Sequence, residues 1–278
     1  MKVCIVGGKG TLGHELTAQL KVLSPFKTYL LEIENVDIES FERVNKTLKE
    51  IVPGVVIYAA EFNDVEACEL RSDDAFIVNA HGAGMVASIC AGIGAKMVYI
   101  SSDFVFSGEK SSSYNEKDPP KPINIYGWSK YFGEHEVEKN LQKHFIIRTA
   151  RIFGERQTSF INTVLNLPTS NSIFKVIGDQ RGSCTYTKDL ALGINRLLSE
   201  NSIKKYGIYH FVNSGSCTWY EMALKICKIK NLNIRLENVS AAQLNKKALY
   251  PTNLTLANHS PFQFRPWEEA LEEYILKR

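Results

Sequence analysis

The sequence lacks long apolar runs, blocks of like charge and paired cysteine motifs. No uninterrupted apolar stretch approaches the roughly 18 residues of a membrane span, and the N-terminal MKVCIVGG carries no signal-peptide pattern. We therefore expect a cytoplasmic protein without a membrane partner. Lys and Arg total 33 against 30 Asp and Glu, spread along the chain, which argues against a nucleic-acid surface. None of the six cysteines lies in a C-x-x-C motif, which predicts reduced, buried thiols and no metal site.

The first half of the chain alternates short apolar runs with longer amphipathic ones. Such alternation is typical of βαβ units, in which a buried parallel sheet is covered by helices on both faces. The 278 residues, 44% of them hydrophobic, suffice for one large domain or two unequal ones. The predicted strands are 2–6, 28–31, 55–59, 97–101 and 145–150, and the predicted helices begin near Leu12 and cover 41–51, 75–93 and 126–141.

A glycine-rich segment, Gly7-Gly8-Lys9-Gly10-Thr11-Leu12-Gly13, follows the first predicted strand and opens a helix. Glycines at this spacing allow a tight turn, close approach of a pyrophosphate to the backbone, and close helix–strand packing. The helix N-terminus then offers free N–H groups to the phosphates. A plain βα turn without a ligand is the alternative interpretation. The context favours a dinucleotide site in an α/β, Rossmann-type doubly wound parallel sheet, with these candidates for cofactor binding: Gly7, Lys9, Gly10, Thr11, Leu12 and Gly13.

Acidic residues follow the second predicted strand, at Glu32 and at Asp37, which precedes Ile38. A carboxylate at this point can accept a hydrogen bond from the adenosine ribose, and Asp37 could instead contact the adenine amine. Lys9 could meet a 2′-phosphate. The sequence therefore leaves NADPH and NADH both open as the cofactor.

Tyr126 and Lys130 are four residues apart, about twenty-five residues after Ser102. On a helix they share one face, where the ammonium can favour the charged phenol and lower its pKa. Such a phenol can donate a proton to a carbonyl oxygen as hydride arrives. Ser102, at the carboxyl end of a predicted strand, can hydrogen-bond the same oxygen. The pattern predicts a catalytic set of Ser102, Tyr126 and Lys130.

The second half has less regular alternation. Helices are predicted at 160–167, 187–199, 219–229 and from Pro266, with a strand at 207–211. The polar segments 178–187 and 249–260 are typical of loops that border a ligand. We predict a dinucleotide-binding domain at 1–155, with a returning segment near 187–213, and a mainly substrate-binding region at 156–278. The two should enclose a cleft.

With these motifs the chain resembles the extended short-chain dehydrogenase/reductase family, within it the dTDP-4-dehydrorhamnose reductase group. Besides the glycine segment and Tyr126-Gly127-Trp128-Ser129-Lys130, the resemblance rests on segments along nearly the whole chain. They are Val56-Ile57-Tyr58-Ala59-Ala60, Val78-Asn79-Ala80, Ser101-Ser102-Asp103-Phe104-Val105-Phe106, Gly178-Asp179-Gln180-Arg181-Gly182-Ser183, Tyr186-Thr187-Lys188-Asp189-Leu190, Gly207-Ile208-Tyr209-His210-Phe211 and Trp219-Tyr220.

The resemblance implies a nicotinamide cofactor and a nucleotide-linked 4-keto-6-deoxyhexose, reduced at C4. It implies Tyr126 as proton donor, Lys130 as the anchor of the nicotinamide ribose, and Ser102 with Asp103 beside the keto group. Ala59 and Ala60 would line the cofactor channel.

Several positions depart from the family pattern. Asn63 stands where the family has a hydroxyl near the nicotinamide, and Tyr250 stands where it has an arginine that helps to fix the substrate. The following serine and a common proline appear here as Leu254 and Cys184. The candidates for substrate binding are therefore Ser102, Asp103, Asn63, Tyr250 and the two phosphate candidates Arg151 and Arg181. Trp219 and Trp267 are expected as packing anchors.

Three hypotheses follow from these residues. The first is an NAD(P)H-dependent reductase of a nucleotide-activated 4-keto deoxy sugar in polysaccharide synthesis. The second is an NAD-dependent sugar-nucleotide epimerase or dehydratase, in which Glu61 or Asp103 supplies an extra acid or base. The third is a non-catalytic NAD(P)-binding regulatory subunit, against which the intact Tyr126 and Lys130 argue. The oligomeric state stays open, with a homodimer among the alternatives.

Overall fold

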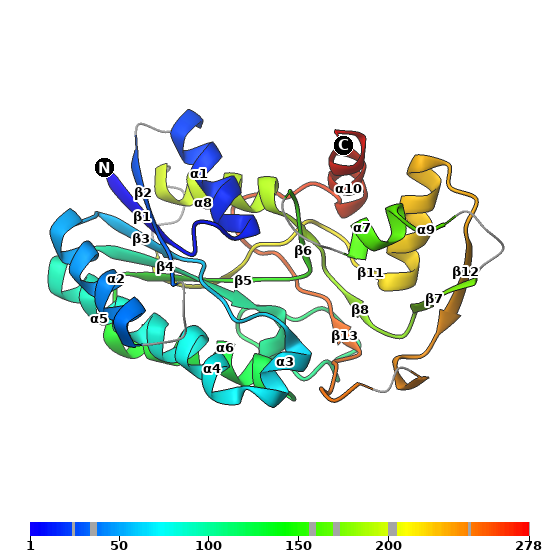
Figure 1. Ribbon diagram of the computed structural model, residues 1–278, viewed down its shortest axis with the longest axis horizontal. Helices are drawn as coiled ribbons and strands as arrows, with labels where there is room; N and C mark the ends of the chain where they lie inside the picture. Colours follow the sequence, from blue (N-terminus) through cyan, green and yellow to red (C-terminus); the bar gives the residue numbers. More distant parts are fainter. Residues whose placement is uncertain are drawn as a thin grey trace.

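Six parallel strands form the central sheet of the computed structural model, in the order β10-β5-β4-β3-β1-β2 (Figure 1). The structure describes residues 1–23, 26–33, 38–155, 160–168, 173–199, 205–243 and 246–277. The strands are β1 (Lys2–Val6), β2 (Lys27–Leu31), β3 (Val55–Tyr58), β4 (Lys96–Ser102), β5 (His144–Thr149) and β10 (Gly207–His210). Because the order reverses at β1, the connections after β1 and β3 diverge and leave a crevice at the carboxyl ends of these strands.

Helices cover both faces of the sheet, as the sequence predicts. Along β1, Val3 and Ile5 belong to one hydrophobic core and Cys4 and Val6 to the other, since successive side chains point to opposite faces. The first core is closed by α1 (Thr11–Leu23) and α8 (Thr187–Ser199). The second is closed by α2 (Ile38–Ile51), α5 (Ala83–Ile93) and α6 (Ile125–Asn140) (Figure 1). The predicted Rossmann-type fold is confirmed.

The predicted helix 75–93 is longer and less regular than expected. It follows α3 (Val65–Leu70) and consists of α4 (Ser72–Phe76), the π-helix η1 (Ile77–Gly82) and α5. Hydroxyl groups from the sheet bind carbonyls of the π-helix: Tyr58 Oη donates to Val78 O at 2.7 Å and Tyr99 Oη to Asn79 O at 2.8 Å. These carbonyls are thereby satisfied from outside the helix, which favours the wider turn.

The buried Asn79 side chain joins three parts of the structure. Its amide nitrogen donates to Phe62 O at 3.1 Å and to Ser129 Oγ of α6 at 2.9 Å, and its oxygen accepts from Phe62 N at 2.9 Å.

By length and composition the helical segment Ser72–Ile93 (22 residues, mean hydropathy 1.5) could cross a membrane, but 50% of its apolar window is buried inside the protein. Its packing against α6 and the sheet is that of a core helix.

The second half of the chain builds a separate cluster of small elements at the end of the molecule opposite α2 and α5 (Figure 1). Its helices surround a third hydrophobic core that contains Trp267 and Tyr274. The elements are β6 (Ile152–Phe153), α7 (Phe160–Leu165), β7 (Ile173–Ile177), β8 (Arg181–Gly182), β9 (Thr185–Tyr186), β11 (Cys217–Thr218), α9 (Trp219–Lys230), β12 (Arg235–Val239), η3 (Ala241–Gln243), β13 (Asn253–Leu254) and α10 (Trp267–Leu276).

The small sheets of this part differ from the sequence prediction. Strands β7 and β12 pair in parallel, and β8 pairs with β11 and β13. Of these strands, β8 and β13 lie inside the segments 178–187 and 249–260, which the sequence predicts as irregular loops. Ladders of two to five residues between distant segments leave no clear periodicity in the sequence.

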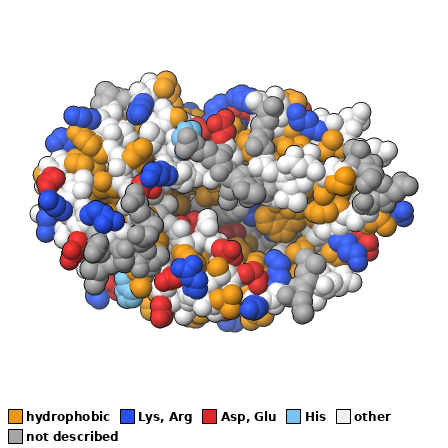
Figure 2. Space-filling view, in the orientation of Figure 1, with side chains coloured by type: hydrophobic (Ala, Val, Ile, Leu, Met, Phe, Trp, Pro, Cys, Tyr) orange, Lys and Arg blue, Asp and Glu red, His pale blue; other side chains and the backbone are white. Residues whose placement is uncertain are grey.

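On the face in Figure 2, basic and acidic side chains are interspersed, so neither sign of charge dominates the surface in view.

The close packing of α6 against the sheet depends on Gly133. A Cβ atom there would lie 2.2 Å from Asn79 O and 2.2 Å from Tyr99 Oη. We expect Gly133→Ala to lower the free energy of unfolding by about 1–3 kcal/mol, measured by urea denaturation. The matched control is Gly92→Ala in α5, where a Cβ would meet nothing within 4 Å. The control should leave stability unchanged or raise it by up to about 1 kcal/mol, and equal effects of the two variants would contradict the packing argument.

Candidate active site

The glycine turn between β1 and α1 has the geometry of a phosphate-binding loop. Gly7 has φ +87°, and a Cβ at Gly7 would lie 2.5 Å from Ala60 N. A Cβ at Gly13 would lie 2.2 Å from Gly7 O, so side chains at either position would open the turn. Gly10, Thr11, Leu12 and Gly13 border a cavity at the N-terminus of α1. Backbone N–H groups and the positive end of the helix there suit a pyrophosphate.

The carboxylate after β2 is held beside this turn. Glu32 Oε1 accepts a hydrogen bond of 2.7 Å from Lys9 N. This places an acidic group where the adenosine ribose of a dinucleotide lies in Rossmann-type folds. The other acidic candidate, Asp37, lies outside the described residues, and Ile38 is described only as the first residue of α2.

Ser102 ends β4 and is followed by the 3₁₀-helix η2 (Asp103–Val105). Ser102 Oγ donates to Asp103 Oδ1 at 3.0 Å, and both side chains are buried. Burial raises the pKa of Asp103 from 3.8 to about 7, although the Arg151 charge and the Ser102 hydrogen bond oppose the shift. Asp103 can therefore exchange a proton near neutral pH beside the Ser102 hydroxyl.

Tyr126 and Lys130 come from the first turns of α6, at the carboxyl end of β4. Asn124 caps the helix by accepting from Gly127 N at 2.8 Å. A Cβ at Gly127 would lie 2.2 Å from Phe104 O, so this glycine lets the helix approach η2. Lys130 Nζ is 1% exposed and donates to Ile100 O of β4 at 2.6 Å. The lysine thus fixes the tyrosine over the strand ends.

Glu61 lies between the two, although it comes from the segment after β3. Tyr126 Oη donates a hydrogen bond to Glu61 Oε1, which lies 3.6 Å from Lys130 Nζ. Burial, followed by the Glu61 charge, raises the pKa of Tyr126 well above its usual value. The prediction that Lys130 makes this phenol more acidic is therefore wrong: burial and the hydrogen-bonded Glu61 carboxylate raise the phenol pKa instead. Burial lowers the pKa of Lys130 itself, and Glu61 and Glu134 oppose that shift.

Glu61, Ser102, Asp103 and Tyr126 border one cavity of about 380 Å³ between the two parts of the chain, and Lys130 lies behind its lining. From the sheet side it is bordered by the glycine turn and by Ala59, Glu61, Asn63, Ser102 and Tyr126. The facing wall comes from the second half, with these residues: Phe160, Ile161, Trp219, Met222 and Tyr250. The predicted cleft therefore exists, and it brings the phosphate-binding turn and the proton-transfer groups together.

Arg151 is the cation of this cavity. Its guanidinium donates to Cys217 O at 2.7 Å and to Gln180 O at 2.8 Å, and it lies 4.4 Å from the ring centroid of Trp219. Both of these hydrogen-bond acceptors are neutral backbone carbonyls, which do not neutralise the positive charge of the guanidinium. Trp219, expected only as a packing anchor, also lines the cavity. An anionic substrate group could be bound here.

Other predicted residues lie outside the cavity lining. Arg181 Nη2 donates to both carboxylate oxygens of Glu221, at 2.7 and 2.9 Å, on a partly exposed surface. Gly7 and Ala60 shape the turn from behind. The backbone of Lys9 contacts Glu32. Within the described residues, no cluster of His, Cys, Asp or Glu could hold a metal ion.

A buried ion pair beneath the site had no signal in the sequence. Arg148 of β5 donates to both carboxylate oxygens of Glu134, at 2.8 and 2.6 Å, and Ser101 Oγ donates to the same carboxylate at 2.5 Å. The pair ties α6 to β4 and β5. The residues are 14 positions apart on different elements, so only the folded chain reveals the contact.

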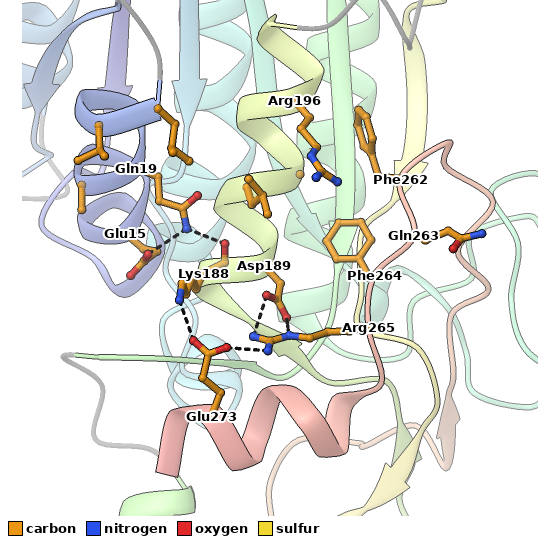
Figure 3. A pocket seen from close by; sticks show the side chains of 15 residues that line it. Glu15, Gln19, Lys188, Asp189, Arg196, Phe262, Gln263, Phe264, Arg265 and Glu273 are labelled. Carbon is orange, nitrogen blue, oxygen red and sulfur yellow. Dashed lines mark hydrogen bonds and ion pairs between the residues drawn. The ribbon is translucent and has the colours of Figure 1, made fainter. Parts of the chain in front are cut away.

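A second cavity, of about 630 Å³, lies between α1, α8 and the segment before α10 (Figure 3). Four of its charged groups pair with one another: Arg265 with Asp189 at 2.9 Å and with Glu273 at 2.6 Å, and Lys188 with Glu273 at 2.7 Å. None of the predicted site residues that the structure describes lines it. The pairs join α8 to α10 and so serve the packing of the two parts.

The fold and the site together define an NAD(P)-dependent oxidoreductase of the extended short-chain dehydrogenase/reductase type. The family model described as RmlD substrate binding domain matches residues 1–278, and the chain belongs to this family. It is 35% identical to the spore coat polysaccharide biosynthesis protein SpsK of Bacillus subtilis strain 168, over 100% of this chain and 98% of that protein.

Two solved structures are similar over the whole chain. The dTDP-4-dehydrorhamnose reductase of Clostridium acetobutylicum has a TM-score of 0.93 at 32% identity, covering 100% of both chains. That of Bacillus anthracis, in complex with NADP, has a TM-score of 0.92 at 35% identity, covering 100% of this chain and 99% of the other. The resemblance inferred from the motifs is confirmed.

The buried carboxyl of Asp103 should make stability depend on pH. Its folded pKa of about 7 exceeds the roughly 3.9 of an unfolded aspartate, so the folded state binds more protons in between. Unfolding free energy should therefore fall as pH rises from about 4 to 7. We expect Asp103→Asn to gain stability relative to the unsubstituted protein between pH 5 and pH 8, measured by urea denaturation. Asp73→Asn, which removes an exposed carboxyl, is the control, and an equal change in both variants would contradict the assignment.

Proposed function

We propose that this enzyme reduces the 4-keto group of a nucleotide-activated deoxy sugar with NADH or NADPH, as a dTDP-4-dehydrorhamnose reductase does. The observation that carries the proposal is that Ser102 and Tyr126 meet in one cavity with the phosphate-binding turn. Relatives with that enzyme name, and the polysaccharide biosynthesis protein, support the substrate class and a role in polysaccharide synthesis. The substrate is then a nucleotide sugar.

The two parts of the chain would bind different ligands. Residues 1–155 with the returning segment 187–213 would bind the dinucleotide, and 156–278 would mainly bind substrate. The addition of β10 to the central sheet and the packing of α8 on α1 support the returning segment. The cavity walls contributed by Phe160, Trp219 and Tyr250 support a substrate role for the second part.

The residues around the glycine turn fit a dinucleotide. Gly10, Thr11, Leu12 and Gly13 would hold the pyrophosphate, with Gly7 and Ala60 keeping the turn tight. The cofactor supplies the hydride. Ala59 would border it, and Lys130 would bind the nicotinamide ribose through its ammonium group.

The proton-transfer step belongs to the chain's own residues. Ser102 Oγ would donate a hydrogen bond to the substrate keto oxygen and orient it, with Asp103 accepting from Ser102 before substrate binds. Tyr126, neutral because of its raised pKa, would give its proton to that oxygen as the alcohol forms. A neutral phenol is the form that a reduction needs.

The substrate's anionic part would lie toward Arg151. Asn63 and Tyr250 line the same cavity and would contact the sugar or the nucleotide. Tyr250 packs edge-on against Phe104, with ring centroids 6.2 Å apart, and Lys246 Nζ lies 3.9 Å from its ring centroid. A phenol at this position cannot replace a bidentate arginine, so Arg151 is the proposed phosphate contact in its stead, ahead of Arg181.

One observation favours the epimerase or dehydratase alternative: Glu61 and Asp103 supply two further carboxyl groups next to Tyr126. Tightly held NAD that purifies with the protein would point to that reaction. Cofactor binding without turnover, with a stoichiometric protein partner, would point to the regulatory subunit. We place the protein in the cytoplasm, as the substrate class requires soluble nucleotide sugars, and a homodimer stays an expectation.

Loss of the Tyr126 hydroxyl should abolish turnover. We expect Tyr126→Phe to lower kcat by about 10²–10⁴-fold in the oxidation of NADH or NADPH with a dTDP-linked 4-keto-6-deoxyhexose. Cofactor affinity, measured by calorimetry, should be retained. Tyr131→Phe on the same helix is the control and should keep full activity. Unchanged turnover in Tyr126→Phe, or no turnover of any nucleotide sugar by the unsubstituted enzyme, would refute the proposed reaction.

The Glu32 carboxylate should select the unphosphorylated cofactor. It would accept a hydrogen bond from a ribose hydroxyl and repel a 2′-phosphate, so we expect kcat/KM to favour NADH over NADPH by about tenfold or more. Glu32→Gln should narrow this ratio, while Glu42→Gln, at an exposed position on α2, should not. A preference for NADPH would instead support the contact between Lys9 and a 2′-phosphate.

A further inference from the structure

Glu61 connects the proton donor of the site to its surroundings. Its carboxylate accepts the hydrogen bond of Tyr126 Oη, while 24% of its own side-chain surface is exposed. By contrast, Tyr126 is 7% exposed and the Lys130 side chain 1%. Glu61 also lines the cavity, whereas Lys130 does not. Of these three groups, the carboxylate has the widest access to water.

We propose that Glu61 returns a proton from solvent to Tyr126 after each turnover. This inference rests on the proposed reduction, in which hydride goes to the carbonyl carbon and the Tyr126 proton to its oxygen. That transfer leaves a phenolate beside a carboxylate. Water then protonates Glu61 and is left as hydroxide, which the bulk buffer neutralises, and Glu61 passes the proton to Tyr126 Oη. The phenol and the carboxylate are both restored, with one proton taken from solvent.

The charges around Glu61 favour this uptake. Two adjacent anions repel each other, so the pair binds a proton more tightly than either group alone would. Tyr126 and Lys130 face Glu61 from α6, Tyr99 faces it from β4 and Cys68 from α3. Asp103, whose pKa is about 7, adds a further negative charge near Tyr126 when it is ionised. Lys130 is the cation of this group and compensates one negative charge, which leaves the second to be compensated by a proton.

The direction of the existing hydrogen bond supports the same assignment. With substrate absent, the proton resides on the phenol, and the Glu61 carboxylate accepts the hydrogen bond that the phenol donates. This is the state that a relay must regenerate before the next substrate binds. Lys130, already donating to Ile100 O and held without exposure, is poorly placed to exchange protons with water.

The test separates the first turnover from those that follow. Glu61→Gln keeps an oxygen that can accept from Tyr126 but cannot carry a proton. In rapid mixing with saturating cofactor and substrate, we expect this variant to oxidise one cofactor per site at a rate within about twofold of the unsubstituted enzyme. Its steady-state rate should then be at least tenfold lower. In Glu61→Ala, added formate should restore steady-state turnover, because a small carboxylic acid can enter and supply the proton.

Asp73→Asn, an equal change of charge at an exposed position of α4, is the control and should behave as the unsubstituted enzyme. Full steady-state activity of Glu61→Gln would overturn the inference. So would an equal loss in the first and later turnovers without formate rescue, which would indicate a structural role.

A measurement without substrate or cofactor tests the coupling of the two groups. The ultraviolet absorbance of the Tyr126 phenolate is obtained as the difference between proteins with Tyr126 and matched Tyr126→Phe variants. It should develop at lower pH in Glu61→Gln than with Glu61 present, because the carboxylate charge raises the phenol pKa. An unchanged titration would overturn the inference. If the titration shifts but no nucleotide sugar is reduced by the unsubstituted enzyme, the proposed reaction fails while the coupling stands.

Discussion

The burial of the Lys130 ammonium is the interaction on which the site depends. A charged side chain with 1% exposure is costly to bury unless it is hydrogen-bonded and its charge is compensated. Here a strand carbonyl of β4 accepts a hydrogen bond from the ammonium, and the Glu61 carboxylate lies 3.6 Å away as its counter-charge. Because both partners lie at the carboxyl ends of β3 and β4, the lysine holds α6 at that edge of the sheet. Tyr126, one turn earlier on the helix, is thereby fixed over the crevice.

The other groups of the site lie at the same edge of the sheet, because the carboxyl ends of parallel strands meet there. The turn after β1 offers backbone N–H groups, the segment after β3 a carboxylate, and the end of β4 a hydroxyl beside a carboxyl. The second half of the chain closes this edge with an aromatic and apolar wall, and Arg151, which directly follows β5 of the central sheet, adds a cation to the cavity. The reacting groups and the surface that faces them are thus contributed by different parts of one polypeptide.

The sequence predicts this architecture where local pattern and burial agree. Val55–Tyr58 is buried throughout, and such apolar runs followed by amphipathic helices indicate a parallel sheet. The pairing of β7 with β12 joins residues about sixty positions apart, and its half-exposed strands give no such pattern. Likewise, helical spacing predicts that Tyr126 and Lys130 share a face. It does not predict that Glu61, 65 residues earlier, accepts the hydrogen bond of the phenol, or that burial and the Glu61 charge raise the phenol pKa. Contacts between elements determine the electrostatics of the site.

The side-chain amide of Asn79 affects the position of the proton-transfer groups although it does not contact them. Its oxygen and its nitrogen both hydrogen-bond the backbone of Phe62, the neighbour of Glu61, and the nitrogen also donates to Ser129 on the helix that carries Tyr126. The distance between the Glu61 carboxylate and the Tyr126 phenol is therefore set in part by a fully buried side chain that contacts neither solvent nor the cavity lining.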